Sequence, residues 1–267
     1  MNGAFLMQDP ALLCALTHPQ RIAPCAVHVW SFHLAASASC LEECRQSLSP
    51  SEQARAQRFV AAQDRDDFIV AHGVLRHLLA LYSGDSAADL SFSVAASGKP
   101  SLAAHSDTLS FNLTHAQGCA LIAVSDGQQI GVDLEKADRQ VKALAIAQRY
   151  FAPTERQAIE SAPAAARGEV FFRYWVAKEA VLKGAGIGLQ FPIDEFEVQF
   201  DAQGQSARIR TGEGSTLGSD WMIRMLPVEE GWAAAMAARG SNWTLCLEGA
   251  SNIQSDSFSA AAVPPRR

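Results

Sequence analysis

The sequence predicts an α+β protein built from two similar halves, and three observations support this prediction. Short stretches that alternate apolar and polar residues, as strands do, are interspersed with stretches of helical periodicity. The order of these elements restarts near Gln128, roughly the midpoint of the chain. A chain of 267 residues, of which 48% are hydrophobic and 19% charged, is long enough to bury a core in each half. No sequence repeat is visible, so the duplication is inferred from the order of elements alone.

The first half is expected at residues 26–128, after an N-terminal extension over residues 1–25. Residues 26–34 alternate like a half-buried strand. Ser49 is the expected cap of a helix, because Pro50 and Glu52 follow it in the pattern of a capping box. Apolar residues at helical spacing predict a further helix over 64–82. Strands are expected at 90–94, 109–113 and 119–124, with turns at 97–100 and 114–118.

The second half is expected at residues 129–250. It begins with a strand at 130–135, and helices are expected at 141–150, 153–161 and 170–184, the last one ended by Gly184 and Gly186. Five strands are expected to follow, at 196–200, 207–211, 221–226, 232–238 and 243–248. Residues 251–267 are small and polar, with a Pro-Pro pair, and we expect a disordered tail there.

Composition and charge exclude several classes of protein. The net charge of -6 argues against a dedicated nucleic-acid binder, which needs a basic surface. No apolar run is long enough to cross a bilayer, and the first nineteen residues lack the basic start of a signal peptide. The six cysteines show no C-x-x-C pair and no spacing suited to zinc. We therefore expect a cytoplasmic protein with reduced thiols and neither a membrane nor a nucleic acid as partner.

Two carboxylates occupy alternate positions in Gly131-Val-Asp-Leu-Glu135. On a strand, Asp133 and Glu135 point to one side, while Val132 and Leu134 point to the other side, toward a core. Like charges on one face repel unless a cation or water separates them, and a hard divalent ion suits such a pair. A solvated strand end shows the same pattern, so the motif by itself leaves both interpretations open.

The segment Trp175-Val-Ala-Lys-Glu-Ala-Val-Leu-Lys183 places an aromatic ring, a third carboxylate and two ammonium groups on one helix. At helical spacing, Trp175, Glu179 and Lys183 share a stripe, with Lys178 beside it. Only five of the 22 basic residues are lysines, so two lysines in one short motif stand out. The alternative is an ordinary exposed Glu–Lys pair.

A hydroxyl and an imidazole end the segment Ser110-Phe-Asn-Leu-Thr-His115, which is expected to run from a strand into a turn. A single histidine is more often structural than functional. No nucleophile elbow is present, and the glycines after residue 183 follow a helix instead of opening one, so neither a hydrolase triad nor a dinucleotide fold is predicted. With Arg76 on an earlier helix, these acidic and basic groups indicate a site for a metal ion and a polyphosphate.

These motifs together resemble the surfactin-synthetase-activating (Sfp) type of 4'-phosphopantetheinyl transferase. The match rests on Phe111-Asn-Leu-Thr-His115, Gly131-Val-Asp-Leu-Glu135 and, about forty residues later, the segment from Trp175 to Lys183 with its continuation Gly184-Ala-Gly-Ile-Gly-Leu189. Weaker matches are Ser97-Gly-Lys-Pro100, Arg58-Phe59 and Phe151-Ala-Pro-Thr-Glu155. The resemblance covers roughly residues 26 to 248.

The resemblance implies transfer of the phosphopantetheine arm of coenzyme A to a serine of an acyl, peptidyl or aryl carrier protein, with release of adenosine 3',5'-bisphosphate. It makes Asp133, Glu135 and Glu179 the ligands of one Mg²⁺, with Glu179 also part of the catalytic group. Glu155 falls where the family places a general base for the carrier serine. A first-turn Glu that stabilises its helix is the alternative for Glu155. Lys183 is expected to stabilise or protonate the leaving phosphate.

The resemblance also assigns residues to coenzyme A. It places Lys99 and Pro100 at the adenine end, Thr114 and His115 at the 3'-phosphate, and Lys178 at a phosphate or on the carrier side. Arg55 and Arg76 are the further basic residues expected at the coenzyme A side of the site. Three departures from the family pattern concern this side: Asp67 stands where relatives carry Arg, Glu52 where a relative has Lys, and Thr114 replaces the commoner Ser.

The family fold is a pseudo-dimer of two similar α/β halves with the active site in the cleft between them. We therefore expect His115 and Lys99 on one side of that cleft and the carboxylates on the other, and an active monomer. Residues 141–167 are the expected docking surface for the carrier protein. Fatty-acid, polyketide, peptide-synthetase and siderophore systems all remain open as sources of the carrier. The second hypothesis is a catalytically inactive module that binds coenzyme A or carrier proteins.

Overall fold

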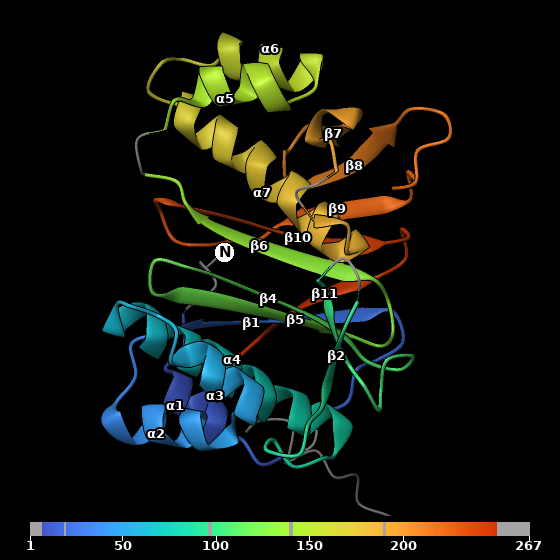
Figure 1. Cartoon of the computed structure of the whole chain (residues 1–267). Coiled ribbons are helices and arrows are strands. Elements are labelled where there is room, and N and C mark those ends of the chain that lie inside the picture. Colours follow the sequence, from blue (N-terminus) through green and yellow to red (C-terminus); the bar gives the residue numbers. More distant parts are fainter. Residues whose placement is uncertain (1–6, 19, 96–97, 139–140, 189–190, 250–267) are drawn as a thin grey trace, which may run out of the picture.

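Two β-sheets stack face to face in the computed structural model, and helices cover the outer face of each sheet (Figure 1). The structure describes residues 7–249 apart from 19, 96–97, 139–140 and 189–190. The expected disordered tail, part of the N-terminal extension, Ser97 of one weaker motif and Leu189 at the end of the main match therefore lie outside the described residues. In the described part of the chain, no helix is long and apolar enough to span a membrane.

The first sheet has the strand order β11-β1-β5-β4. Its strands are β1 (Ala26–His33), β4 (Ser110–Ala116), β5 (Cys119–Ser125) and β11 (Thr244–Glu248). The helices on its outer face are α1 (Pro10–Cys14), α2 (Ala38–Ser47), α3 (Pro50–Ala56) and α4 (Ala62–Ser83). A short hairpin of β2 (Phe92–Val94) and β3 (Pro100–Leu102) lies beside them.

Helix α3 begins as the sequence predicts. Ser49 accepts a hydrogen bond from the backbone N–H of Glu52, and the Glu52 carboxylate accepts one from the backbone N–H of Ser49, so the capping box is complete. Helix α4 ends at Gly84, whose φ of 80° lies in the left-handed region that glycine adopts without strain. Its apolar residues face the sheet and include Phe68, Leu75 and Leu78.

The second sheet has the strand order β6-β10-β9-β8-β7. Its strands are β6 (Ile130–Lys136), β7 (Phe196–Phe200), β8 (Ser206–Thr211), β9 (Trp221–Met225) and β10 (Trp232–Arg239). The helices are α5 (Ala143–Tyr150), α6 (Pro153–Ser161), α7 (Arg167–Ala185) and a 3-10 turn, η2 (Ile193–Glu195). Helix α7 lies across the outer face of this sheet, and α5 and α6 lie beyond it (Figure 1).

A shared apolar layer joins the two sheets. Val27, Val29 and Leu121 of the first sheet pack in one cluster with Val132 and Leu134 of the second sheet. Each of these residues is at most 1% exposed. The alternation on β6 is thus resolved as the sequence predicts, because Val132 and Leu134 enter a core and the carboxylates turn the other way.

The structure confirms an α+β fold of two similar layered halves. One strand, however, belongs to a different sheet from the one that the order of elements predicts. Strand β11, expected in the second half, pairs in parallel with β1 at the edge of the first sheet. Helices α1 and α2 and strand β3 were not expected. Strand β4 continues through Thr114 and His115 to Ala116, so the expected turn at 114–118 shrinks to Gln117 and Gly118, both at positive φ.

Candidate active site

The centre of the site is the outer face of β6, where Asp133 and Glu135 lie two residues apart under α7. Asp133 is 4% exposed, while Glu135 is half-buried. Strand β6 is the edge of its sheet, and the Asn112 side-chain oxygen on β4 accepts the backbone N–H of Val132 at 2.8 Å. One amide side chain therefore fastens the edges of the two sheets at the site.

Two glycines allow α7 to approach β6 closely. A Cβ on Gly131 would stand 2.1 Å from the carbonyl oxygen of Ala180, and a Cβ on Gly184 would stand 2.6 Å from the Trp221 ring. Neither distance leaves room for a methyl group, so larger residues would push the helix away from the sheet. This close packing brings the last two turns of α7, with Glu179 and Lys183, over the β6 carboxylates.

Three elements meet at one oxygen of Asp133. The Lys183 ammonium lies 2.6 Å from Oδ1, and the Thr114 hydroxyl on β4 lies 3.3 Å from the same atom. Lys183 also donates to Thr114 Oγ1 at 2.9 Å. Thr114, Asp133 and Lys183 therefore meet at one point, although they come from β4, β6 and α7.

The other carboxylate oxygens at the site are suited to a cation. Asp133 Oδ2 and Glu179 Oε1 are buried, and neither has a hydrogen-bond partner among the residues that the structure describes. Burial and the charges of Asp133 and Glu135 raise the pKa of Glu179 to about 7. Buried anionic oxygens that repel one another fit a hard divalent ion. Two other groups of three metal-binding side chains in the described chain have their ligand atoms within 4.8 Å of one another. The carboxylates of Asp133, Glu135 and Glu179 are spread more widely than that.

A cleft of about 510 Å³ lies beside α3, α4 and the β2–β3 hairpin. Arg55 and His72 line it together with apolar residues such as Leu75 and Phe92, and Pro100 lies at its edge. His115 is exposed next to the charged side of this cleft. Partial burial lowers the pKa of His115, as do the nearby charges of His72, Lys183 and Arg55, while Asp67 raises it. His115 therefore lies within electrostatic range of both Lys183 and the cleft residues His72 and Arg55.

Arg76 does not act as the sequence analysis expected. It is 1% exposed and donates to the Glu52 carboxylate at 2.8 Å and to the carbonyl oxygens of Ala87 and Leu90. The Glu52 carboxylate also lies 3.3 Å from His72 Nδ1. The guanidinium is hydrogen-bonded to groups inside the protein, so it is not available to bind a phosphate. Arg76 instead stabilises the structure that lines the cleft. Glu52, one of the departures from the family pattern, is the partner that neutralises it.

Lys178 and Glu155 also require a correction. Lys178 is 0% exposed, and its ammonium contacts the Glu155 carboxylate at 3.0 Å and the carbonyl oxygens of Ile193 and Phe196. These contacts use all three N–H donors, so Lys178 cannot bind a phosphate or a carrier protein in this structure. Glu155 is 1% exposed and also accepts the backbone N–H groups of Ala152 and Val198. Its geometry supports the structural alternative and argues against a general base.

Lys99 bridges the two halves at the end of the site. Its ammonium donates to the carbonyl oxygens of Ile130 at 3.1 Å and Gly184 at 2.6 Å. Ile130 is the first residue of β6, and Gly184 directly follows Lys183 in α7. Burial lowers the pKa of Lys99 to about 8. Lys99 and Pro100 line a second, smaller cavity that borders the first one and includes Phe111 and Gly186.

Two residues of the site were missed at the level of sequence. His72 lines the cleft and lies four residues before Arg76, so helical spacing from Arg76 was an available signal. Asn112 sits inside the Phe111–His115 motif, but its role became visible only when β4 was found next to β6.

Comparisons of the sequence with known proteins point to one family. Residues 129–237 match the model of the 4'-phosphopantetheinyl transferase superfamily, and residues 35–127 match the model of a 4'-phosphopantetheinyl transferase N-terminal domain. The chain is 34% identical over 220 residues to the 4'-phosphopantetheinyl transferase HetI of Nostoc sp., covering 81% of this chain and 89% of that protein. It is 29% identical to the 4'-phosphopantetheinyl transferase Sfp of Bacillus subtilis, covering 59% of this chain and 69% of that protein.

Proposed function

The chain belongs to the 4'-phosphopantetheinyl transferase family, and we propose that it transfers the phosphopantetheine group of coenzyme A to a serine of an acyl, peptidyl or aryl carrier protein. The observation that carries this proposal is the meeting of Thr114, Asp133 and Lys183 beside the buried oxygen of Glu179. An enzyme that breaks a pyrophosphate bond needs cationic and metal-binding groups at one point, and this group provides both.

The cleft of the N-terminal half suits the nucleotide end of coenzyme A. Phe92 and Leu75 offer apolar surface to a flat ring, Arg55 offers a positive charge to a phosphate, and the His72 imidazole lines the same cleft. His115 is close enough to Lys183 and Arg55 to feel their charges, and its exposed imidazole can contact a second phosphate. Asp67 opposes an anion at the same place, so we expect weaker 3'-phosphate binding than an arginine there would give.

The three carboxylates fit a Mg²⁺ ion because they offer the oxygen ligands that this ion prefers. Asp133 Oδ2 and Glu179 Oε1 are buried oxygens without partners, and Glu135 lies on the same strand face as Asp133. When bound, the ion would supply charge stabilisation to the pyrophosphate. The residues themselves fix where that charge sits, because Asp133 is held by Thr114 and Lys183 and Glu179 is held by its helix.

Lys183 and Glu179 divide the remaining work. The Lys183 ammonium is 30% exposed at the mouth of the site and stabilises negative charge on the leaving phosphate oxygen. With Glu155 buried under Lys178, Glu179 is the carboxylate that we assign to accept the proton of the carrier serine.

The carrier protein is proposed to dock on α5 and the segment after α6. Leu144 and Tyr150 on α5 are 38% and 41% exposed, and Lys142 and Arg167 line a hollow next to them. Exposed apolar side chains with local positive charge suit an acidic helix, although the whole chain is acidic. The proposal therefore relies on local complementarity and not on long-range attraction.

The direct test incubates the protein with coenzyme A, Mg²⁺ and an apo carrier protein and measures the intact mass of the carrier. We expect a mass gain of one phosphopantetheine group that is absent with EDTA or when the target serine is replaced by alanine. Carriers from fatty-acid, polyketide and peptide-synthetase systems belong in the same experiment. Binding of coenzyme A without any mass gain across these carriers contradicts the proposal and supports the inactive binding module.

A further inference from the structure

A lysine of the first half holds two backbone segments of the second half together. The Lys99 ammonium, directly before β3, donates to the carbonyl oxygens of Ile130 at 3.1 Å and Gly184 at 2.6 Å. Ile130 begins β6, and Gly184 lies in the last turn of α7. One ammonium group therefore ties the start of the strand that carries Asp133 to the end of the helix that carries Lys183.

The contact with Gly184 lies at the C-terminal end of α7. The last carbonyl oxygens of a helix lack partners within it, and a cation near them is favourable. Here the backbone N–H of Gly186 bonds to the carbonyl oxygens of Leu182 and Lys183. The next carbonyl oxygen along the helix, that of Gly184, receives the Lys99 ammonium. Removal of the ammonium would therefore loosen the turn that carries Lys183.

The contact with Ile130 lies on the free edge of β6, on the side away from β10. Ile130 and Val132 are two residues apart, so their backbone groups point to the same side of the strand. On that side the Lys99 ammonium binds the carbonyl oxygen of Ile130. The Asn112 side chain binds the N–H of Val132. Two side chains of the first half thus occupy the place of a neighbouring strand and fix the segment that leads into Asp133.

Close packing makes the position of α7 on β6 sensitive to these contacts. A Cβ on Gly131 would stand 2.3 Å from the backbone nitrogen of Gly184, so the strand and the helix already touch beside the Lys99 ammonium. We propose that Lys99 is a positioning residue, which holds the end of α7 on the start of β6 and so keeps Lys183 opposite Asp133. This role rests on the proposed transfer reaction, in which Lys183 and Asp133 act at one point.

A lysine that bound the nucleotide would have different consequences. The resemblance places Lys99 at the adenine end of coenzyme A, and Lys99 lines a small cavity together with Pro100 and Phe111. A contact with the nucleotide strengthens its binding, whereas a contact that orients a reacting group acts on kcat. The split between nucleotide affinity and kcat in a Lys99 variant therefore decides between the two roles.

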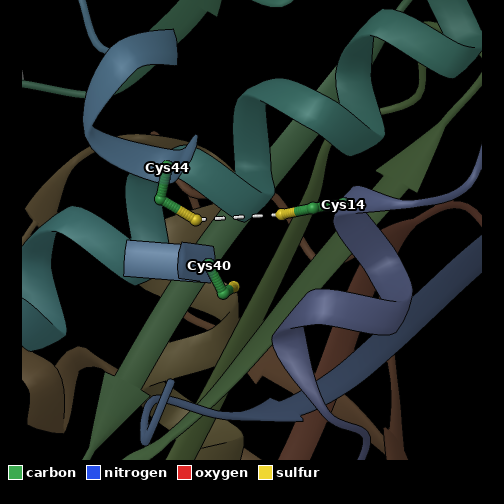
Figure 2. Close-up of side chains that lie close together, drawn as sticks. All are labelled: Cys14, Cys40 and Cys44. Atoms are coloured by element: carbon green, nitrogen blue, oxygen red, sulfur yellow. Dashed lines mark hydrogen bonds between the residues drawn. The ribbon is translucent and has the colours of Figure 1, made fainter. Parts of the chain in front are cut away.

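The experiment compares the parent chain with Lys99→Met, Lys183→Met, the double variant and Cys40→Ser. Methionine keeps most of the apolar length of the lysine side chain but cannot donate to the two carbonyl oxygens. Cys40→Ser is the control for a loss of stability without a displaced α7. Cys40 lies with Cys14 and Cys44 in the core between α1, α2 and α4, on the outer face of the first sheet and away from α7 (Figure 1, Figure 2).

Each protein is measured in four ways. The carrier mass assay at saturating coenzyme A gives kcat, and calorimetry gives the Kd of adenosine 3',5'-bisphosphate. Hydrogen–deuterium exchange mass spectrometry follows the amides of residues 182–187 at the end of α7, and the melting temperature follows stability. Exchange and nucleotide binding do not depend on transfer, so both can be measured even if no carrier is modified.

Lys99→Met should lower kcat by about 10²-fold, the order of loss for a reacting group displaced by about 1 Å. Its Kd for the nucleotide should stay within about twofold of that of the parent, and exchange at the end of α7 should be faster. In the Lys183→Met background the same change should lower kcat by a smaller factor, because the residue that Lys99 positions is absent. Cys40→Ser should melt at a lower temperature but keep the kcat and the α7 exchange of the parent.

An unchanged kcat in Lys99→Met overturns the proposal, and so does unchanged exchange at the end of α7. A weaker nucleotide Kd with the kcat of the parent assigns Lys99 to the nucleotide instead. Losses that multiply in full in the double variant show that Lys99 acts apart from Lys183, which also contradicts the proposal. If the parent modifies no carrier, the proposed function fails, and the exchange data alone decide whether Lys99 holds α7 on β6.

Discussion

Lys183 Nζ lies 2.6 Å from Asp133 Oδ1, and this ion pair joins the last turn of α7 to strand β6. The contact uses Oδ1 of Asp133. The other oxygen, Oδ2, is buried without a hydrogen-bond partner in the described part of the chain and can serve as a metal ligand. The packing of Gly131 against α7 sets the separation of the two elements. The cationic and the anionic halves of the proposed chemistry are therefore positioned by the same contact.

Asp133→Asn should abolish most of the transfer reaction and leave the fold intact. The amide keeps the shape of the side chain but loses the charge that binds the ion and holds Lys183. We expect a loss of about 10²–10³-fold in kcat, as for removal of one electrostatic contact to a transition state. Rates from the carrier mass assay, with circular dichroism as the folding control, measure this. A variant with unchanged kcat contradicts the assignment.

Replacing the two lysines of α7 by methionine should have opposite consequences. Lys183→Met should lose activity with little change in stability, since its side chain is partly exposed. Lys178→Met leaves the Glu155 charge buried without its partner and should cost about 3–5 kcal/mol in the free energy of unfolding. Urea unfolding and the mass assay on both variants separate the two roles. A stable Lys178→Met that has lost phosphate binding would return this lysine to the active site.

Glu179 should make the metal-free protein less stable as the pH rises. Its pKa of about 7 in the folded chain exceeds the ordinary 4.5, so the folded state binds the proton more tightly than the unfolded state. Stability should therefore fall by about 3 kcal/mol between pH 4.5 and pH 7. Unfolding curves in EDTA across this range, compared with Glu179→Gln, test the effect. Identical slopes for the two proteins would exclude Glu179 as the source.

Glu52 should contribute stability with the opposite dependence on pH. Burial raises its pKa, but hydrogen bonds from His72, Ser49 and Arg76 outweigh that effect and hold the pKa at about 2. The stabilisation is complete above pH 4.5 and is lost as the pH falls from 4.5 through 2. We expect Glu52→Gln to be destabilised at pH 7 by about 3 kcal/mol, and the difference from the parent to shrink in acid. Acid titrations of both proteins at fixed urea concentration measure it.

Gly131→Ala should damage both stability and activity. The added methyl group would meet the Ala180 carbonyl oxygen at 2.1 Å and displace α7 from β6. Overpacking of this kind costs about 1–3 kcal/mol, and the shift separates Lys183 from Asp133. Gly212→Ala is the matched control, because no atom lies within 4 Å of its added methyl group. Thermal unfolding and the mass assay should distinguish the two variants, and equal behaviour contradicts the role of close packing.

The sequence predicted the strands and helices that carry the site better than it predicted the elements that pack around them. The alternation on β6 correctly predicted that Asp133 and Glu135 lie on the same face of the strand, because side chains two residues apart point to the same side. The capping box at Ser49 and the glycine stop of α7 were equally local signals. Helices α1 and α2 escaped prediction, since α1 has five residues and α2 (ASCLEECRQS) has only one large aliphatic side chain to mark its buried face.

The sequence by itself determined the types and spacing of the chemical groups, because the periods of helix and strand are local properties of the backbone. Only the tertiary structure decided which of them meet. Lys178 and Lys183 are five residues apart, about 140° around a helix, and packing against η2 and β7 buried the first while the second reached Asp133. The pairing of β11 with β1 likewise depends on a chain path that no local pattern encodes, and it alone places Cys246 beside His28.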